Sequence, residues 1–296
     1  MAHAAPQHDY HLVDPSPYPL ISSITVTVMM VGAVAWMKGL FGIEEGTSWL
    51  FFAGLAGTLY AMGAWWWDVI RAGQKGDHTP VVSIGLRYGM TLFIASEVMF
   101  FAAFFWMFFE MALFNEARTN IPEISSWAET AAAWSTWPPR GIETLDPWQL
   151  PLLNTVILLL SGTTVTWAHH ALQVGDRSGA RLGLIITVAL GILFTGVQIY
   201  EYEHILHDNL FFNEEASSSG LYGSVFFMAT GFHGFHVLVG TIFLAVCLIR
   251  LMAGQMRPEK HFGFEAAAWY WHFVDVVWLF LFAFIYVWAA GPIAHH

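Results

Sequence analysis

The chain has 296 residues, of which 56% are hydrophobic and only 11% are charged, whereas soluble domains usually carry about 25% charged residues. This composition excludes an ordinary water-soluble domain, and the net charge of −11 argues against binding to nucleic acid. A single cysteine, Cys247, excludes a disulfide framework and a cysteine-based metal cluster. The sequence therefore predicts an all-α integral membrane protein.

Seven apolar stretches are long enough to cross a bilayer as helices, which takes about 20 residues each. In chain order the predicted spans are Leu20–Leu40, Trp49–Ile70, Leu86–Leu113, Leu152–Leu172, Leu182–Tyr200, Leu221–Met252 and Phe264–Ala289. Residues 1–19 precede the first span and carry no Lys or Arg, so they lack the basic start of a secretory signal peptide. The longest connection covers residues 115–151, and its tryptophans predict that it lies on the membrane surface.

Basic residues are distributed unequally between the two sides of the predicted spans. Eight of the 11 fall on one side, which the positive-inside rule places in the cytoplasm. These eight are Arg71, Lys75, Arg87, Arg177, Arg181, Arg250, Arg257 and Lys260. The N-terminal segment 1–19 and the loop 71–85 are then cytoplasmic, and the loop 115–151 and the tail 290–296 lie outside.

Glu97 is the most unusual residue of the chain because it interrupts the apolar stretch Leu92–Trp106. It follows Arg87 by about ten residues, or roughly 15 Å of helix, which is close to the middle of a hydrocarbon layer about 30 Å thick. A carboxylate at that depth must be protonated, paired or turned toward a polar interior. Its own helix offers only phenylalanines at helical spacing, so we expect the partner to come from elsewhere.

Other polar residues are predicted at a similar depth. His233 and His236 are three residues apart and share a helix face with glycines that permit close helix approach, and His272 and Asp275 repeat the same spacing. Three interpretations remain open: histidines converging on a redox metal, a proton or ion pathway through Glu97, His233, His236 and Asp275, or pairing across helices that holds the bundle together. Pairing is favoured for His272 and Asp275.

A separate aromatic cluster closes the second span on its cytoplasmic side. Trp65, Trp66 and Trp67 precede Asp68 and Arg71, and His78 follows shortly afterwards. Aromatic rings beside basic groups are typical of phospholipid head-group contacts, and they are equally typical of an ordinary interfacial belt.

Taken together, these motifs resemble subunit III of cytochrome c oxidase, in the haem-copper oxidase family. The resemblance runs along nearly the whole chain, in order, through the segments Tyr10–Pro17, Leu86–Met90, Ser96–Phe101, Trp137–Pro139, Pro151–Thr155, Thr166–His170, Gly231–His236, His261–Glu265 and Trp269–Trp278.

The resemblance implies seven transmembrane helices in two bundles, separated by a V-shaped cleft filled with phospholipid. Residues 20–70 would form the two-helix bundle and residues 86–289 the five-helix bundle. By family likeness Glu97 lines the cleft, and the lipid-contacting residues are Trp65, Trp66, His78, Glu97, His236 and Arg250. The resemblance implies no catalytic and no metal-binding residue in this chain, because haem and copper belong to partner subunits.

The implied function is that of a non-catalytic subunit of a proton-pumping oxidase that transfers electrons from cytochrome c to oxygen. The chain would contact subunits I and II, bind structural phospholipid, and support proton uptake and stability during turnover. We expect a bacterial cell membrane, with the N-terminus in the cytoplasm and the C-terminus in the periplasm. The alternatives are subunit III of a ubiquinol oxidase, which typically lacks the first two spans, and a stand-alone proton-coupled transporter.

Overall fold

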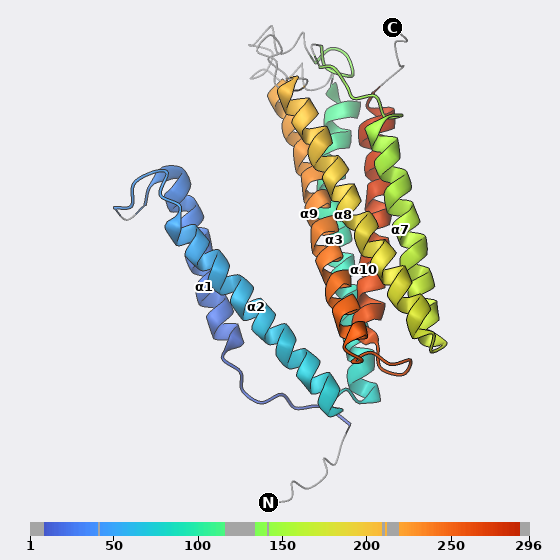
Figure 1. The fold of residues 1–296 in the computed structure, drawn as a ribbon. Coiled ribbons are helices and arrows are strands. Elements are labelled where there is room, and N and C mark those ends of the chain that lie inside the picture. The colour runs from blue at the N-terminus through green and yellow to red at the C-terminus, as the bar shows by residue number, and fades with distance from the viewer. Residues whose placement is uncertain are drawn as a thin grey trace, which may run out of the picture. The chain divides into compact units, whose positions relative to one another are not determined.

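The structure is a computed structural model that describes residues 9–40, 42–115, 134–140, 142–208, 211 and 219–290 (Figure 1). Within these ranges the secondary structure is helical and contains no β-sheet, which confirms the predicted class. The helices are α1 (Tyr18–Lys38), α2 (Trp49–Lys75), α3 (Pro80–Leu113), α7 (Leu150–Gln173), α8 (Arg177–His207), α9 (Ser219–Met252) and α10 (Phe262–Phe280), which continues into the π-helical segment η1 (Leu281–Trp288).

Six helices of the described chain are long and apolar enough to cross a membrane, where seven spans were predicted. The exception is α2, whose second half carries Trp65, Trp66, Trp67, Asp68 and Arg71 in place of aliphatic side chains. Several helices also extend beyond the predicted apolar stretches. Helix α2 continues to Lys75, where Gly76 adopts a left-handed conformation with φ of 96° and ends it. An apolar run marks the part of a helix that suits hydrocarbon, whereas the helix itself continues until a cap satisfies its backbone.

Contacts divide the chain into two compact units, residues 1–86 and residues 87–296. In the first unit α1 and α2 form an antiparallel hairpin whose buried residues are all small: Gly32, Ala35, Gly54 and Ala61. A methyl group added at Gly54 would overlap the backbone of Met29, and one added at Gly32 would overlap the backbone of Leu50 and Phe51. Small residues therefore let the two helix backbones touch, as is common in membrane helix pairs.

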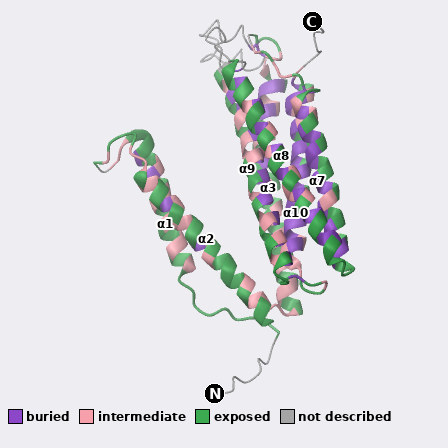
Figure 2. Ribbon diagram, viewed as in Figure 1, coloured by how far each residue is buried: buried purple, intermediate pink, exposed green. Residues whose placement is uncertain are grey.

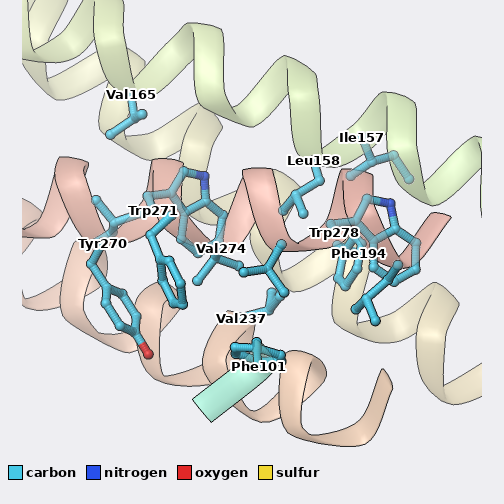
Figure 3. Packing of buried hydrophobic residues seen from close by; sticks show 14 of the residues in the cluster. Phe101, Ile157, Leu158, Val165, Phe194, Val237, Tyr270, Trp271, Val274 and Trp278 are labelled. Carbon is cyan, nitrogen blue, oxygen red and sulfur yellow. The ribbon is translucent and has the colours of Figure 1, made fainter. Parts of the chain in front are cut away.

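The second unit has its core between α7, α8, α9 and α10, where the buried residues gather (Figure 2). Trp271 and Trp278 of α10 are the largest fully buried side chains, and both indoles point toward α7 (Figure 3). Trp271 donates a hydrogen bond to Ser161 Oγ at 2.8 Å, and Trp278 donates one to Thr155 Oγ1 at 2.9 Å. Buried indoles need such partners, and the two bonds fix the register of α10 on α7.

Helix α3 joins this core mainly through aromatic side chains. Phe100 packs edge-to-face on Phe232 of α9 with ring centroids 5.0 Å apart, and Phe109 packs in the same way on Phe284, also at 5.0 Å. Near the start of the unit, the guanidinium of Arg87 donates hydrogen bonds to both carboxylate oxygens of Glu265, the shortest being 2.9 Å. Aromatic edge-to-face pairs add to simple burial of area, so this helix is held by rings and by a few polar contacts.

Helix α8 begins with a side-chain cap whose contribution to stability should depend on pH. Asp176 Oδ1 accepts hydrogen bonds from the backbone N–H groups of Gly179 and Ser178, at 3.0 and 3.1 Å, and from Ser178 Oγ at 2.8 Å. The Gly179 bond, followed by the Ser178 hydroxyl, lowers the pKa of Asp176 below its usual value of about 3.9. Because the folded-state pKa is depressed, the charged cap stabilises the folded chain above pH of about 4 and is lost as the pH falls through the folded-state pKa.

We therefore expect the thermal stability of the wild-type chain to exceed that of Asp176→Ala near neutral pH, and the difference to shrink as the sample is acidified below pH of about 4. The matched variant Asp176→Asn keeps a neutral cap, so its advantage over Asp176→Ala should not vary with pH. Melting temperatures measured from pH 7 to pH 3 in detergent test this. An unchanged difference between wild type and Asp176→Ala over that range would contradict the assignment.

Candidate functional site

The structure brings Glu97 and His236 together across helices. Glu97 lies at the middle of α3 and His236 at the middle of α9, and Glu97 Oε2 is 2.8 Å from His236 Nε2. The two side chains are largely covered, with 21% of Glu97 and 9% of His236 exposed. The partner that Glu97 requires from another span is therefore a histidine of the Gly231–His236 motif.

The hydrogen bonds of His236 define how many protons the pair holds. His236 Nδ1 is 2.6 Å from the carbonyl oxygen of Phe232, and a carbonyl can only accept, so Nδ1 carries a hydrogen. The contact between Nε2 and Glu97 then holds one further proton. Either a neutral carboxyl donates to Nε2, or a charged imidazolium donates to a carboxylate. In both cases the pair as a whole is electrically neutral, which reduces the cost of placing it inside a membrane.

Aromatic rings surround the Glu97–His236 pair. The centroid of the His236 ring lies 5.0 Å from Phe101, 5.9 Å from Phe100 and 6.3 Å from Tyr270. These rings exclude water from the imidazole, and hydrogen bonds are stronger in such surroundings than in water. Glu97 is the more exposed member of the pair, so a group outside the bundle can reach the pair through this carboxyl.

His233 lies one turn from His236 but makes different contacts. It is fully buried, and its Nε2 donates a hydrogen bond to the carbonyl of Val274 on α10 at 3.1 Å. Its ring packs against Trp278, with centroids 5.1 Å apart, and its buried Nδ1 finds no hydrogen-bond partner among the described residues. His233 therefore joins α9 to α10, and it does not point toward the same atom as His236.

His272 and Asp275 face α7. His272 Nε2 is 3.0 Å from Thr166 Oγ1, so this histidine pairs across helices as expected. The carboxyl of Asp275 is buried over Gly162, where an added Cβ would overlap Oδ2. We expected a donor from a neighbouring span for Asp275, but its Oδ1 has no hydrogen-bond partner in the part of the chain that the structure describes.

The described histidines and carboxylates do not assemble into a metal site. Over the described ranges, no group of three or more His, Cys, Asp or Glu side chains is placed to hold a metal ion. His236 is bonded at both ring nitrogens, and His272 is bonded through Nε2. The interpretation based on pairing across helices therefore accounts for Glu97, His236 and His272.

The remaining predicted site residues lie on α2, in the connection after it and at the end of α9. Trp65 and Trp66 are more than half exposed on α2, and the imidazole of His78 lies against Gly73, where an added Cβ would meet its Cε1 at 2.9 Å. Arg250 is in the last turn of α9, in the second unit, where its Nε donates to Gln255 Oε1 at 3.3 Å. Arg71 also lies 5.6 Å from the centroid of the Trp67 ring, within the range of a cation–π contact.

One buried network was not among the predicted site residues. Glu201 of α8 is fully buried, and its Oε1 accepts hydrogen bonds from Gln198 at 3.0 Å and from Tyr286 at 2.7 Å. Gln198 in turn accepts from Asn154 of α7 at 3.4 Å. The spacing of Gln198 and Glu201, three residues apart near the end of an apolar stretch, was the available signal. Tyr286 is distant in sequence and gives no such signal.

The fold and these contacts define a class of protein: a helical membrane protein with several spans, whose intramembrane polar groups mainly bond to one another. A family model described as cytochrome c oxidase subunit III matches residues 8–290. The chain is 52% identical to cytochrome c oxidase subunit 3 of Marchantia polymorpha over 286 residues, which covers 96% of this chain and 98% of the relative. It is 49% identical to the subunit 3 of Prototheca wickerhamii, which covers 96% of this chain and 99% of the relative. It is 48% identical to the subunit 3 of Danio rerio, which covers 98% of this chain and 100% of the relative.

The chain therefore belongs to the cytochrome c oxidase subunit III family. It is an integral membrane subunit of an oxidoreductase complex that contains other subunits. The expected bacterial cell membrane does not agree with these relatives, which come from a liverwort, an alga and a fish. Residue types and their spacing indicate which segments lie in a membrane and at what depth, but they do not identify the organism.

Proposed function

We propose that this chain is a non-catalytic subunit of a proton-pumping cytochrome c oxidase, and that it acts on subunit I by packing and by holding phospholipid. The observation that supports this most is the Glu97–His236 hydrogen bond. The most costly polar group of the membrane region is used for pairing between helices, and His236 retains no free ring nitrogen for a metal. Haem, copper and the cytochrome c reaction are assigned to the partner subunits I and II.

The finer arrangement is proposed from the family likeness. Helix α2 also crosses the membrane, which brings the number of spans to seven. Residues 20–70 form a bundle of two helices and residues 86–289 a bundle of five, and phospholipid fills a cleft between the bundles. The N-terminal segment lies on one side of the membrane and the C-terminus on the opposite side. The lipid contacts are Trp65, Trp66, His78, Glu97, His236 and Arg250. The exposed edge of Glu97 and the exposed indoles of Trp65 and Trp66 support this, because each can meet a lipid.

The proposal is tested by removing this chain selectively from the purified oxidase complex and following oxygen consumption with reduced cytochrome c. We expect the depleted complex to begin at nearly the rate of the intact complex and then to lose activity faster with each turnover. Adding the purified chain back with phospholipid should restore the slow decay. Loss of the initial rate on removal, or an unchanged decay, would contradict a supporting role.

The separated chain from the same preparation also distinguishes the proposed subunit from the alternative, a stand-alone transporter. A transporter would move protons in vesicles that contain this chain alone, whereas the proposed subunit would not. Membership in the cytochrome c oxidase subunit III family favours the subunit.

A further inference from the structure

A depression in the surface formed by α7 and α10 is not explained by the contacts described above. It has a volume of about 400 Å³ and is lined by Leu159, Gly162, Thr163, Thr166, His272 and Asp275. Gly162 is at the middle of α7, and Asp275 is at the middle of the apolar span Phe262–Trp288. The depression therefore lies at the depth where a membrane is driest.

Asp275 is the one carboxylate in this depression, and its bonding is incomplete. Only 7% of the residue is exposed, and Oδ1 lacks a hydrogen-bond partner within the described residues. The other oxygen, Oδ2, lies directly over Gly162, and any larger residue at position 162 would displace the carboxyl. The chain thus holds Asp275 in a fixed place while leaving one oxygen without a donor.

The helices that form the depression contain no donor of opposite charge. Helix α7 and the span Phe262–Trp288 contain neither Lys nor Arg. His272 is the other titratable group of the depression, and its Nε2 is bonded to Thr166. A carboxylate facing hydrocarbon without a partner is strongly disfavoured, so Asp275 must either be protonated or meet a donor from outside these two helices.

We infer that the α7–α10 depression is a docking site for a transmembrane helix of another subunit of the complex, and that this helix carries a side chain that donates a hydrogen bond to the carboxyl group of Asp275. Gly162, Thr163 and Thr166 present small side chains, which allow a partner helix to approach closely at mid-membrane depth. Hydrogen-bonding complementarity selects a protein helix over lipid, because acyl chains offer no donor at this depth. The inference rests on membership in a multi-subunit complex.

The direct test uses the intact oxidase complex with a photo-activated cross-linking residue in place of Thr163. The matched control carries the same residue in place of Ile192, which is 61% exposed on α8 and does not line the depression. We expect Thr163 to cross-link to a transmembrane segment of another subunit, and Ile192 to do so far less. Cross-linking of Thr163 only to lipid, or to α1 or α2 of the same chain, would overturn the inference.

A second test measures how firmly the chain is retained in the complex during detergent titration. Asp275→Leu should weaken retention roughly 3- to 20-fold, the range expected for loss of one hydrogen bond between membrane helices. Asp275→Asn keeps an acceptor and should retain most of the binding, and Val276→Leu, which alters the exposed neighbour of Asp275, is the control. Equal retention of Asp275→Leu and Val276→Leu would overturn the inference. A wild-type chain that never co-purifies with haem would instead contradict the proposed function.

Discussion

Replacing His236 by leucine is expected to destabilise the contact between α3 and the rest of its unit by about 2–3 kcal/mol. The variant leaves the Glu97 carboxyl inside the membrane without its partner, and a stranded carboxyl costs more than a lost hydrogen bond. Glu97→Leu should cost only about 1 kcal/mol, because the neutral imidazole that remains keeps its Nδ1 bond to Phe232. Unfolding of the purified chain in mixed micelles measures both.

The conservative variant Glu97→Gln separates a structural role from a proton-handling role. A glutamine amide can donate to His236 Nε2, so the hydrogen bond survives while the exchangeable proton is removed. We expect this variant to match wild type in stability within about 1 kcal/mol and, if the role is structural, to show normal decay of oxidase activity with turnover. Equal destabilisation by His236→Leu and Glu97→Gln would contradict the assigned hydrogen bond.

Replacing Gly54 by leucine is expected to open the α1–α2 hairpin, at a cost of about 3 kcal/mol in local stability. The added side chain would meet the backbone of Met29, which cannot move aside without separating the two helices. Hydrogen exchange of α1 amides, followed by mass spectrometry, reports the free energy of this local opening.

Gly63→Leu is the matched control in the same helix, because nothing lies within 4 Å of a Cβ built at Gly63. It should leave exchange in α1 unchanged or slightly slower, since leucine favours a helix by up to about 1 kcal/mol over glycine. Similar acceleration of exchange by both leucine variants would show that the effect arises from glycine loss in α2 and not from the Gly54 contact.

The helices themselves were largely predictable from the sequence, and their ends were not. Long apolar runs predicted each helix of the described chain, because only helices satisfy their backbone within hydrocarbon. The runs did not predict that α2 continues to Lys75 or that α8 begins at Arg177, because caps and turns decide those ends. The Asp176 cap lies outside the apolar stretch and is visible only as an acceptor before a helix start.

The sequence predicted that Glu97 needs a partner from another helix, but it did not predict which residue is that partner. The depth of Glu97 showed that another span must satisfy it, and His236 was among the available residues. Which histidine meets it depends on the rotation of α9 about its axis, which follows from the packing of rings such as Phe100 on Phe232. The same limit explains the Glu201–Tyr286 bond, because residues so far apart in sequence are related only by packing.

The most direct test of the account is to separate this chain from the purified oxidase complex and to measure haem and copper in both fractions, by optical spectra and by elemental analysis. The account predicts that haem and copper remain with the other subunits and that the separated chain contains neither. Haem or copper that leaves with this chain, in proportion to the amount of chain removed, would contradict the account and would make the polar groups around Glu97 and His236 candidates for a redox centre.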